Sequence, residues 1–111
     1  MGTVTTHVLN TAIGRPAAGV AVRLEQVAEA GDGVLGQAVT DDDGRVGELG
    51  PDELAAGHYR LVFETGAYFT ALGEQTFYPR VTIEFEIADP NARYHVPLLV
   101  SPFGMTTYRG S

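Results

Sequence analysis

The sequence contains neither cysteine nor lysine in its 111 residues. The absence of cysteine excludes disulfide bonds, thiol nucleophiles and cysteine-ligated zinc, and it leaves the redox compartment undetermined. All seven basic residues are arginines, so a lysine Schiff base and a lysine phosphate clamp are excluded as well. A domain of this size buries roughly 65% of its unfolded surface, which is enough for one core without metal or disulfide bonds.

The sequence is also poor in positive charge. Its 14 acidic and 7 basic residues give a net charge of −7 at pH 7, which disfavours nucleic acids and anionic membranes as partners. No apolar run approaches the roughly 18 residues of a membrane span, and the first ten residues lack the basic and apolar segments of a secretory signal. We therefore expect one cytoplasmic domain over residues 1–111, with no nucleic acid and no membrane as partner.

What the sequence does have is an alternation of apolar and polar residues with a period of two, interrupted by turn residues at short intervals. It predicts eight strands, at residues 3–9, 20–26, 34–40, 45–49, 58–64, 80–87, 93–100 and 105–110. A short helix is predicted for residues 65–74, and the segment EAGDG at residues 29–33 is a predicted hairpin turn. This pattern predicts an all-β fold, a Greek-key β-sandwich, because a parallel α/β sheet needs more crossover helices.

Two of the three histidines are predicted to face away from the core. His7 alternates with Val8 in its strand, and His95 alternates with Val96, so both histidines point outward if the valines are buried. Leucines share these outward faces, which is unusual for a surface that meets only water and indicates an interface or a ligand groove. The last strand alternates too, and we assign Arg109 and Ser111 to the same outward surface.

Other residues have simpler interpretations. His58 is interpreted as structural or solvated, and Arg45, which follows the acidic turn DDDG, as an exposed arginine paired with Asp41 or Asp43. Pro97 lies inside a predicted strand and requires an edge, a bulge or an interface there. The sequence has no His-Glu-x-x-His motif, no phosphate-binding glycine loop and no G-x-S-x-G elbow.

Four segments carry a resemblance to a known family: THVLNTAIGRPAAGVAVRL, TDDDGRV, FYPRVTIEF and YHVPLLVSPFGMTTYRGS. Through them the chain resembles, over essentially its whole length, the transthyretin-like 5-hydroxyisourate hydrolases. The terminal YRGS and the two histidines separate these hydrolases from transthyretin, the hormone carrier of the same fold. One departure is Asn10, where many relatives carry aspartate in a turn.

The resemblance implies a transthyretin-like eight-stranded sandwich with one short helix. It also implies a homotetramer, a dimer of dimers, with active sites at the dimer–dimer interface. The catalytic residues implied are His7, Arg45, His95 and Ser111, and the implied substrate-binding residues are Tyr108, Arg109 and Gly110.

The implied reaction is a cyclic amidohydrolase step without metal or cofactor. It opens the N1–C6 amide bond of 5-hydroxyisourate, the product of urate oxidation, and yields 2-oxo-4-hydroxy-4-carboxy-5-ureidoimidazoline. The two histidines would share the roles of base and acid, and which histidine has which role is left open. Arg45 would stabilise the oxyanion, and the carboxylate of Ser111 would raise the pKa of an adjacent histidine.

Other functions fit parts of the sequence. A transthyretin-like protein that binds a small molecule without catalysis is the main alternative, and it would need fewer titratable groups than this chain has. A sandwich used only for assembly leaves the two outward histidines unexplained. A metallohydrolase is least favoured, because two histidines without a suitably spaced third ligand make a weak metal site.

Overall fold

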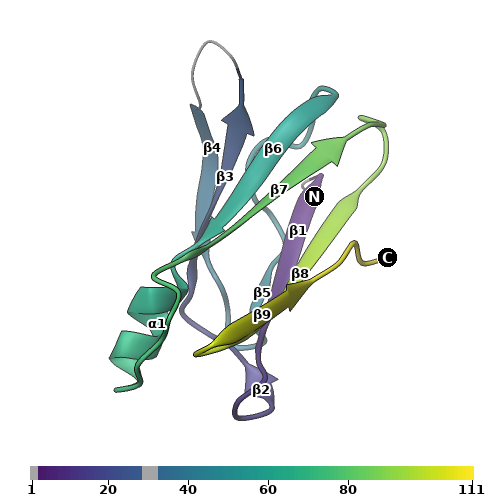
Figure 1. Ribbon diagram of the computed structural model, residues 1–111. Helices are drawn as coiled ribbons and strands as arrows, with labels where there is room; N and C mark the ends of the chain where they lie inside the picture. Colours follow the sequence, from purple (N-terminus) through teal and green to yellow (C-terminus); the bar gives the residue numbers. More distant parts are fainter. Residues whose placement is uncertain (1–2, 29–32) are drawn as a thin grey trace.

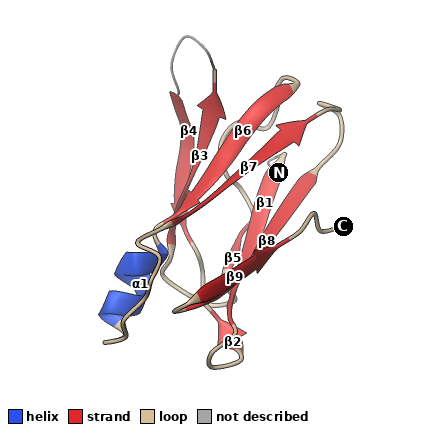
Figure 2. Cartoon of the chain, viewed as in Figure 1, coloured by secondary structure: helices blue, strands red, loops and turns tan. Residues whose placement is uncertain are grey.

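Two β-sheets packed face to face form the protein, with one short helix at one end (Figure 1, Figure 2). The computed structural model describes residues 3–28 and 33–111. The first sheet contains β1 (Val4–Asn10), β2 (Arg15–Pro16), β5 (Arg45–Val46), β8 (Tyr94–Ser101) and β9 (Gly104–Thr107). The second contains β3 (Ala21–Val27), β4 (Gly33–Val39), β6 (Gly57–Phe63) and β7 (Val81–Ile87).

The strand order is β2-β1-β8-β9 in the first sheet, where β5 also pairs with β1, and β4-β3-β6-β7 in the second. β1 and β8 run parallel, whereas every other pair of neighbouring strands is antiparallel. The apolar side of each sheet faces the other and is removed from water, including Val8, Leu24, Leu61 and Leu98. Such burial stabilises the fold by roughly 25 cal/mol per Å² of apolar surface. The two packed sheets confirm the all-β sandwich that the sequence predicted.

The two strands that carry histidines alternate as predicted. In β1 the residues with even numbers are buried, and His7 lies half-buried on the opposite face. In β8 Tyr94, Val96 and Leu98 are buried, whereas His95 is half-buried on that same outer face of the sheet. The prediction that both histidines point away from the core is therefore confirmed.

Several boundaries differ from the predicted ones. β5 ends at Val46 instead of residue 49, and β2 was not predicted, because two residues are too few to show a period. The helix α1 (Thr65–Ala71) is three residues shorter than predicted; it ends before Gly73, whose φ of +74° is the left-handed conformation that stops a helix. No described helix is long and apolar enough to cross a membrane. The predicted turn at residues 29–33 lies outside the described residues except for Gly33.

Pro97 explains why the last strand is shorter than predicted. It is buried inside β8, and continuing the β8–β9 register from Leu98↔Thr107 would pair Pro97 with Tyr108. Proline has no amide hydrogen to donate. The ladder stops there and resumes only as the single bridge His95↔Gly110. The Thr107 hydroxyl donates instead to the Pro97 carbonyl at 2.7 Å.

Asn10, the departure noted in the sequence, is buried at the end of β1. Its side-chain amide donates to the Tyr68 hydroxyl and its side-chain oxygen accepts from the Ala12 amide, both at 3.1 Å. Asn10 thus forms a hydrogen bond with each of these two neighbours and fixes the start of the turn that leads to β2.

Candidate active site

The turn at residues 41–44 holds Arg45 against β1. One carboxylate oxygen of Asp41 accepts hydrogen bonds from the amides of Asp43 and Arg45, each at 2.9 Å. Gly44 has a φ of +77°, and a Cβ built on it would lie 2.3 Å from the Val8 carbonyl oxygen, so the turn requires glycine. The Val8 amide donates to the Gly44 carbonyl at 2.7 Å, which fixes the turn to the strand that carries the first histidine.

Arg45 differs from its simplest interpretation. Asp41 binds its main chain rather than its guanidinium, and within residues 3–28 and 33–111 the guanidinium forms no ion pair. The β1–β5 register pairs Arg45 with His7, so both side chains lie on the outer face of the sheet. The charge of Arg45 is therefore available to a ligand there.

The imidazole of His7 is held by the same turn. Its Nε2 lies 2.8 Å from the main-chain oxygen of Asp43. Because a carbonyl oxygen only accepts hydrogen bonds, Nε2 must carry a proton and donate it. In the neutral ring the lone pair is therefore on Nδ1, and Nδ1 is the atom that can exchange a proton with a ligand.

His95 lies on the neighbouring strand, opposite Thr5 in the β1–β8 register. The Thr5 hydroxyl oxygen is 2.8 Å from Nδ1 of the ring. The amide of Gly110 donates to the His95 carbonyl at 2.8 Å, which brings the last residues of the chain against this histidine.

An open pocket of about 340 Å³ lies beside His95, lined by Thr5, Thr6, Arg45, Val46, Gly47, Arg93, His95 and Ser111. His7 adjoins it on the same face, two residues along β1 from Thr5. This pocket is thus lined by three of the four residues that the resemblance implied as catalytic, namely Arg45, His95 and Ser111, and the fourth, His7, lies beside it. Sequence reasoning missed Thr5 and Arg93. Arg93 could have been found, since it precedes His95 by two positions and so shares its side of the strand.

The surroundings of His95 lower its pKa. Burial disfavours the charged ring most, followed by the positive fields of His7 and Arg45, while the main chain of Thr5 acts in the opposite direction. The increase in pKa that was predicted from the carboxylate of Ser111 is therefore not found at His95. A pKa below the ordinary value of 6.5 favours the neutral ring, which can accept a proton.

The predicted direction of Arg109 is wrong. Its guanidinium carbon lies 4.5 Å above the centre of the Tyr94 ring, and one of its nitrogens donates to the Arg93 carbonyl at 3.3 Å. The register explains the error: Thr107 pairs with the buried Leu98, so Arg109, two residues further on, shares the inner side rather than the side of His95.

Arg109 and Tyr108 line a second, more apolar pocket of about 220 Å³. Its walls come from β7, β8 and the end of β9, and consist of Ile83, Phe85, Glu86, Tyr94, Val96, Thr107, Tyr108 and Arg109. Of the three residues implied as substrate-binding, only Gly110 contacts a histidine within one chain. The other two lie in this separate pocket.

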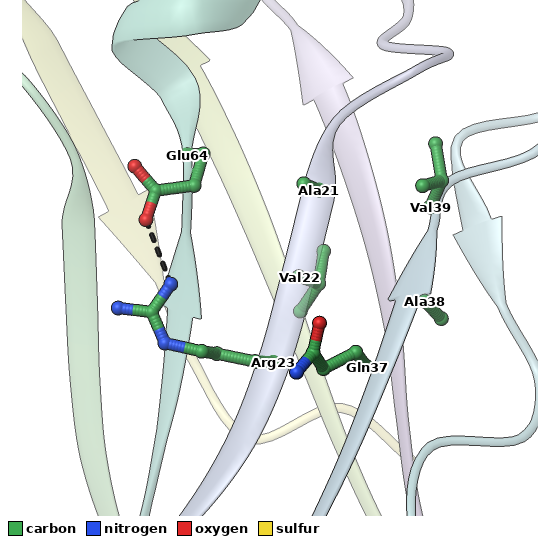
Figure 3. A pocket seen from close by; sticks show the side chains of 7 residues that line it. All are labelled: Ala21, Val22, Arg23, Gln37, Ala38, Val39 and Glu64. Atoms are coloured by element: carbon green, nitrogen blue, oxygen red, sulfur yellow. Dashed lines mark hydrogen bonds and ion pairs between the residues drawn. The ribbon is translucent and has the colours of Figure 1, made fainter. Parts of the chain in front are cut away.

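A third pocket, of about 250 Å³, lies on the outer face of the second sheet (Figure 3). The ion pair between Arg23 and Glu64, at 2.8 Å, extends along one side of it. These charges neutralise each other, and no histidine lines this pocket. It therefore lacks the proton-transfer groups that gather around His95. Within the described part of the chain, His, Asp and Glu side chains form no group of three that could hold a metal ion.

Comparisons with known proteins agree with this fold. The model of the HIUase/Transthyretin family matches residues 4–110. The 5-hydroxyisourate hydrolase of Salmonella dublin is 47% identical over 106 residues, which cover 95% of this chain and 78% of that protein. The structure of Klebsiella pneumoniae 5-hydroxyisourate hydrolase is similar at a TM-score of 0.87 and 39% identity, covering 100% of this chain and 94% of the other. Transthyretin from Sparus aurata has a TM-score of 0.91 and 31% identity, with coverages of 99% and 97%.

Proposed function

The chain belongs to the HIUase/Transthyretin family, and we propose that it hydrolyses 5-hydroxyisourate in the pocket beside His95. The backbone does not separate a hydrolase from a carrier, because the hydrolase and the transthyretin structures both superpose closely on it. The observation that carries the proposal is the arrangement of His95, His7 and Arg45 on one face of the first sheet. A pocket that only binds an apolar ligand has no need of three such groups.

Amide hydrolysis requires a base, an acid and a group that stabilises the oxyanion. In the proposed cyclic amidohydrolase step, neutral His95 takes a proton from a water molecule, whose oxygen forms a bond to C6 of the substrate. The guanidinium of Arg45 stabilises the negative charge that develops on the carbonyl oxygen. The C6–N1 bond then breaks, and His7, acting as the general acid, donates a proton from Nδ1 to the departing nitrogen. Ser111 closes one wall of the pocket.

We also propose that the protein assembles as a homotetramer, a dimer of dimers. Large apolar side chains stay exposed in the single chain, among them Ile13, Leu72, Phe77 and Phe103. A surface of this kind is typical of an interface. In the assembly, a neighbouring copy would cover the open side of the His95 pocket, and Tyr108 and Arg109 would contribute to binding from their own segment.

One observation favours the alternative, binding without catalysis. The pocket between Phe85 and Tyr94 is mostly apolar and has the size of a small aromatic molecule. A carrier would hold its ligand there and leave the histidines unused. This alternative predicts saturable binding with no acceleration of hydrolysis.

The test follows the decay of freshly generated 5-hydroxyisourate by ultraviolet absorbance and records the optical activity of the product. We expect the protein to accelerate the decay and to produce one enantiomer in excess. His95→Asn should lower turnover by about 10²–10⁴-fold, whereas His58→Asn, at an exposed histidine on β6, should leave it unchanged. Decay at the spontaneous rate with folded protein would show that the proposed activity is wrong.

A further inference from the structure

Two residues outside the proposed acid–base pair contact opposite edges of the His95 ring. On one edge, the Thr5 hydroxyl oxygen lies 2.8 Å from Nδ1. On the other, a Cβ built on Gly110 would lie only 2.6 Å from Cδ2 and 3.3 Å from Cγ. Nδ1 and Cδ2 are the two ring atoms bonded to Cγ. The imidazole is therefore enclosed on both sides, and only Cε1 and Nε2 remain for the pocket.

We propose that Thr5 and Gly110 are positioning residues that fix the rotamer of His95 and direct its Nε2 into the pocket. The inference rests on the proposed hydrolysis, in which Nε2 is the atom that accepts the proton. Neither residue touches the reacting atoms. Each acts through the ring of His95.

The contact with Thr5 fits the tautomer that the proposed hydrolysis requires, because a hydroxyl can both donate and accept a hydrogen bond. A ring that acts as a base at Nε2 must carry its proton on Nδ1, and Nδ1–H then donates to the Thr5 hydroxyl oxygen. When Nε2 takes up a second proton, the bond from Nδ1–H to Thr5 persists. The same contact thus serves both protonation states, so the ring need not rotate during proton transfer.

Gly110 limits the position of the ring by its main chain. The hydrogen bond from its amide to the His95 carbonyl, at 2.8 Å, holds the two backbones together. A methyl group at this position would approach Cδ2 more closely than non-bonded carbon atoms do, so the ring would have to turn. The third residue of the YRGS segment is glycine for this reason, independently of any contact with substrate.

The test for Thr5 compares two substitutions. Thr5→Val removes the hydroxyl and keeps the shape, whereas Thr5→Ser keeps the hydroxyl. We expect Thr5→Val to lower kcat/KM by about ten- to a hundredfold, as expected for a lost hydrogen bond to a charged group, and Thr5→Ser to restore it to within a few-fold. Thr82→Val, at an exposed threonine on β7 in the other sheet, is the matched control and should behave like the unaltered protein.

Two further measurements distinguish a positioning role of Thr5 from a general loss of structure in the variant. Nitrogen-15 NMR of His95 should show the proton on Nδ1 in the unaltered protein and a shift toward Nε2–H in Thr5→Val. Loss of the acceptor for Nδ1–H also destabilises the charged ring, so the acidic limb of the kcat/KM profile should move to lower pH. The other groups that face His95 are unaltered in this variant: His7 from β1, Arg45 from β5, Arg93 from its own strand, and Ser111.

Gly110→Ala tests the other edge, with Gly104→Ala as its control. Gly104 lies in β9, and an added Cβ there would meet only the Ser101 hydroxyl oxygen at an ordinary distance of 3.6 Å. We expect Gly110→Ala to lower kcat with little change in KM and to displace the ring resonances of His95, and Gly104→Ala to do neither.

Several outcomes would overturn the proposal: full activity and an unchanged tautomer in Thr5→Val, equal losses in Thr5→Val and Thr5→Ser, or undisturbed His95 resonances in Gly110→Ala. If the unaltered protein fails to accelerate hydrolysis, the proposed function is wrong. The NMR experiments would still decide whether Thr5 and Gly110 hold the ring.

Discussion

Among the residues of the pocket, His95 shows most directly how the surroundings set the chemistry of a side chain. Its ring is half-buried, and His7 and Arg45 lie on the same face of the sheet. Burial and positive charge act in the same direction and lower its pKa. A histidine with a lowered pKa stays neutral at pH 7, which a general base requires. The same Arg45 that would stabilise an oxyanion thus also helps to keep the base unprotonated.

Replacing Arg45 should therefore change two properties at once. In Arg45→Gln we expect kcat to fall by about 10²–10³-fold, because the oxyanion loses its charged donor. The pKa of His95 should rise, because one of the charges that lower it is removed. The acidic limb of the kcat/KM profile should then move to higher pH, and an NMR titration of His95 should show the same shift.

Arg80→Gln is the control for Arg45→Gln. This variant also removes one positive charge, from the ion pair between Arg80 and Glu64 at 3.3 Å. Both residues directly adjoin the ends of strands in the other sheet. A pKa of His95 that rises equally in both variants would show that net charge, rather than the position of Arg45, lowers it.

At the scale of elements, the turn at residues 41–44 positions two of the candidate catalytic side chains. It orients Arg45 through its main chain, and its Asp43 carbonyl sets the tautomer of His7. Gly44 is the residue on which this geometry depends, because no side chain fits between the turn and Val8. An all-β protein thus positions two candidate catalytic groups from one four-residue turn.

We expect Gly44→Ala to impair both groups. The methyl group would push the turn away from β1, so activity should fall by at least tenfold and the Tm by about 5 °C or more, as a strained left-handed residue with a clash predicts. Gly33→Ala, where an added Cβ meets no atom of the described residues within 4 Å, should change neither quantity. Activity assays and thermal unfolding measure both effects, and an active, equally stable Gly44→Ala protein would contradict this account of the turn.

The second sheet carries a network of ion pairs on its outer face. Glu25 binds both Arg23 and Arg60 at 2.6 Å, and Glu64 binds Arg23 at 2.8 Å and Arg80 at 3.3 Å. Hydrogen bonds from Arg23, the largest cause in both cases, lower the pKa of each glutamate below its ordinary value of 4.5. The stabilisation is therefore complete above that value and is lost as the pH falls through the lower pKa of the folded state.

This network predicts the acid response of the protein. Glu25→Gln should lower the Tm at pH 7 by about 2–5 °C, a modest amount because the pairs are partly exposed. Below pH 4 the difference from the unaltered protein should shrink, because the unaltered glutamate becomes protonated there as well. Glu53→Gln, at an exposed glutamate in a loop, is the control. A difference in Tm that stays constant down to pH 3 would argue against the ion pairs as its cause.

The sequence predicted the strands well, because a period of two follows directly from backbone geometry and shows which residues are buried. It also predicted which way His7 and His95 face. The direction of Arg109 could not be read in this way, because it depends on the register between β8 and β9 and on the break at Pro97. The contacts of Thr5 and Gly110 with His95 likewise depend on pairings between strands that are distant in the sequence.

At the scale of the whole molecule, charge is distributed unevenly. The chain has a net charge of −7, yet the His95 pocket is lined by Arg45 and Arg93 and adjoins His7. Acidic side chains also lie close by, since Asp41, Asp42 and Asp43 belong to the turn that precedes Arg45. The guanidinium of Arg45, which forms no ion pair within the described residues, can attract an electron-rich ligand to the pocket. The pocket is open on one side in the single chain.

The assembly proposed to cover that side can be tested through the exposed aromatic residues Phe77 and Phe103. Their segments are joined, since the Phe77 amide and the Thr76 hydroxyl both bind the Pro102 carbonyl, at 2.9 and 2.6 Å. The two rings are 71% and 70% exposed, which is costly for aromatic side chains in water. Replacing both by serine should therefore convert the tetramer into smaller species in light scattering, while circular dichroism stays that of a folded β protein. Turnover should fall with the tetramer, because the pocket would then stay open.

Val34→Ser, at an exposed valine on β4, should alter neither mass nor turnover, and a double variant that remains tetrameric would show that the copies meet through another surface.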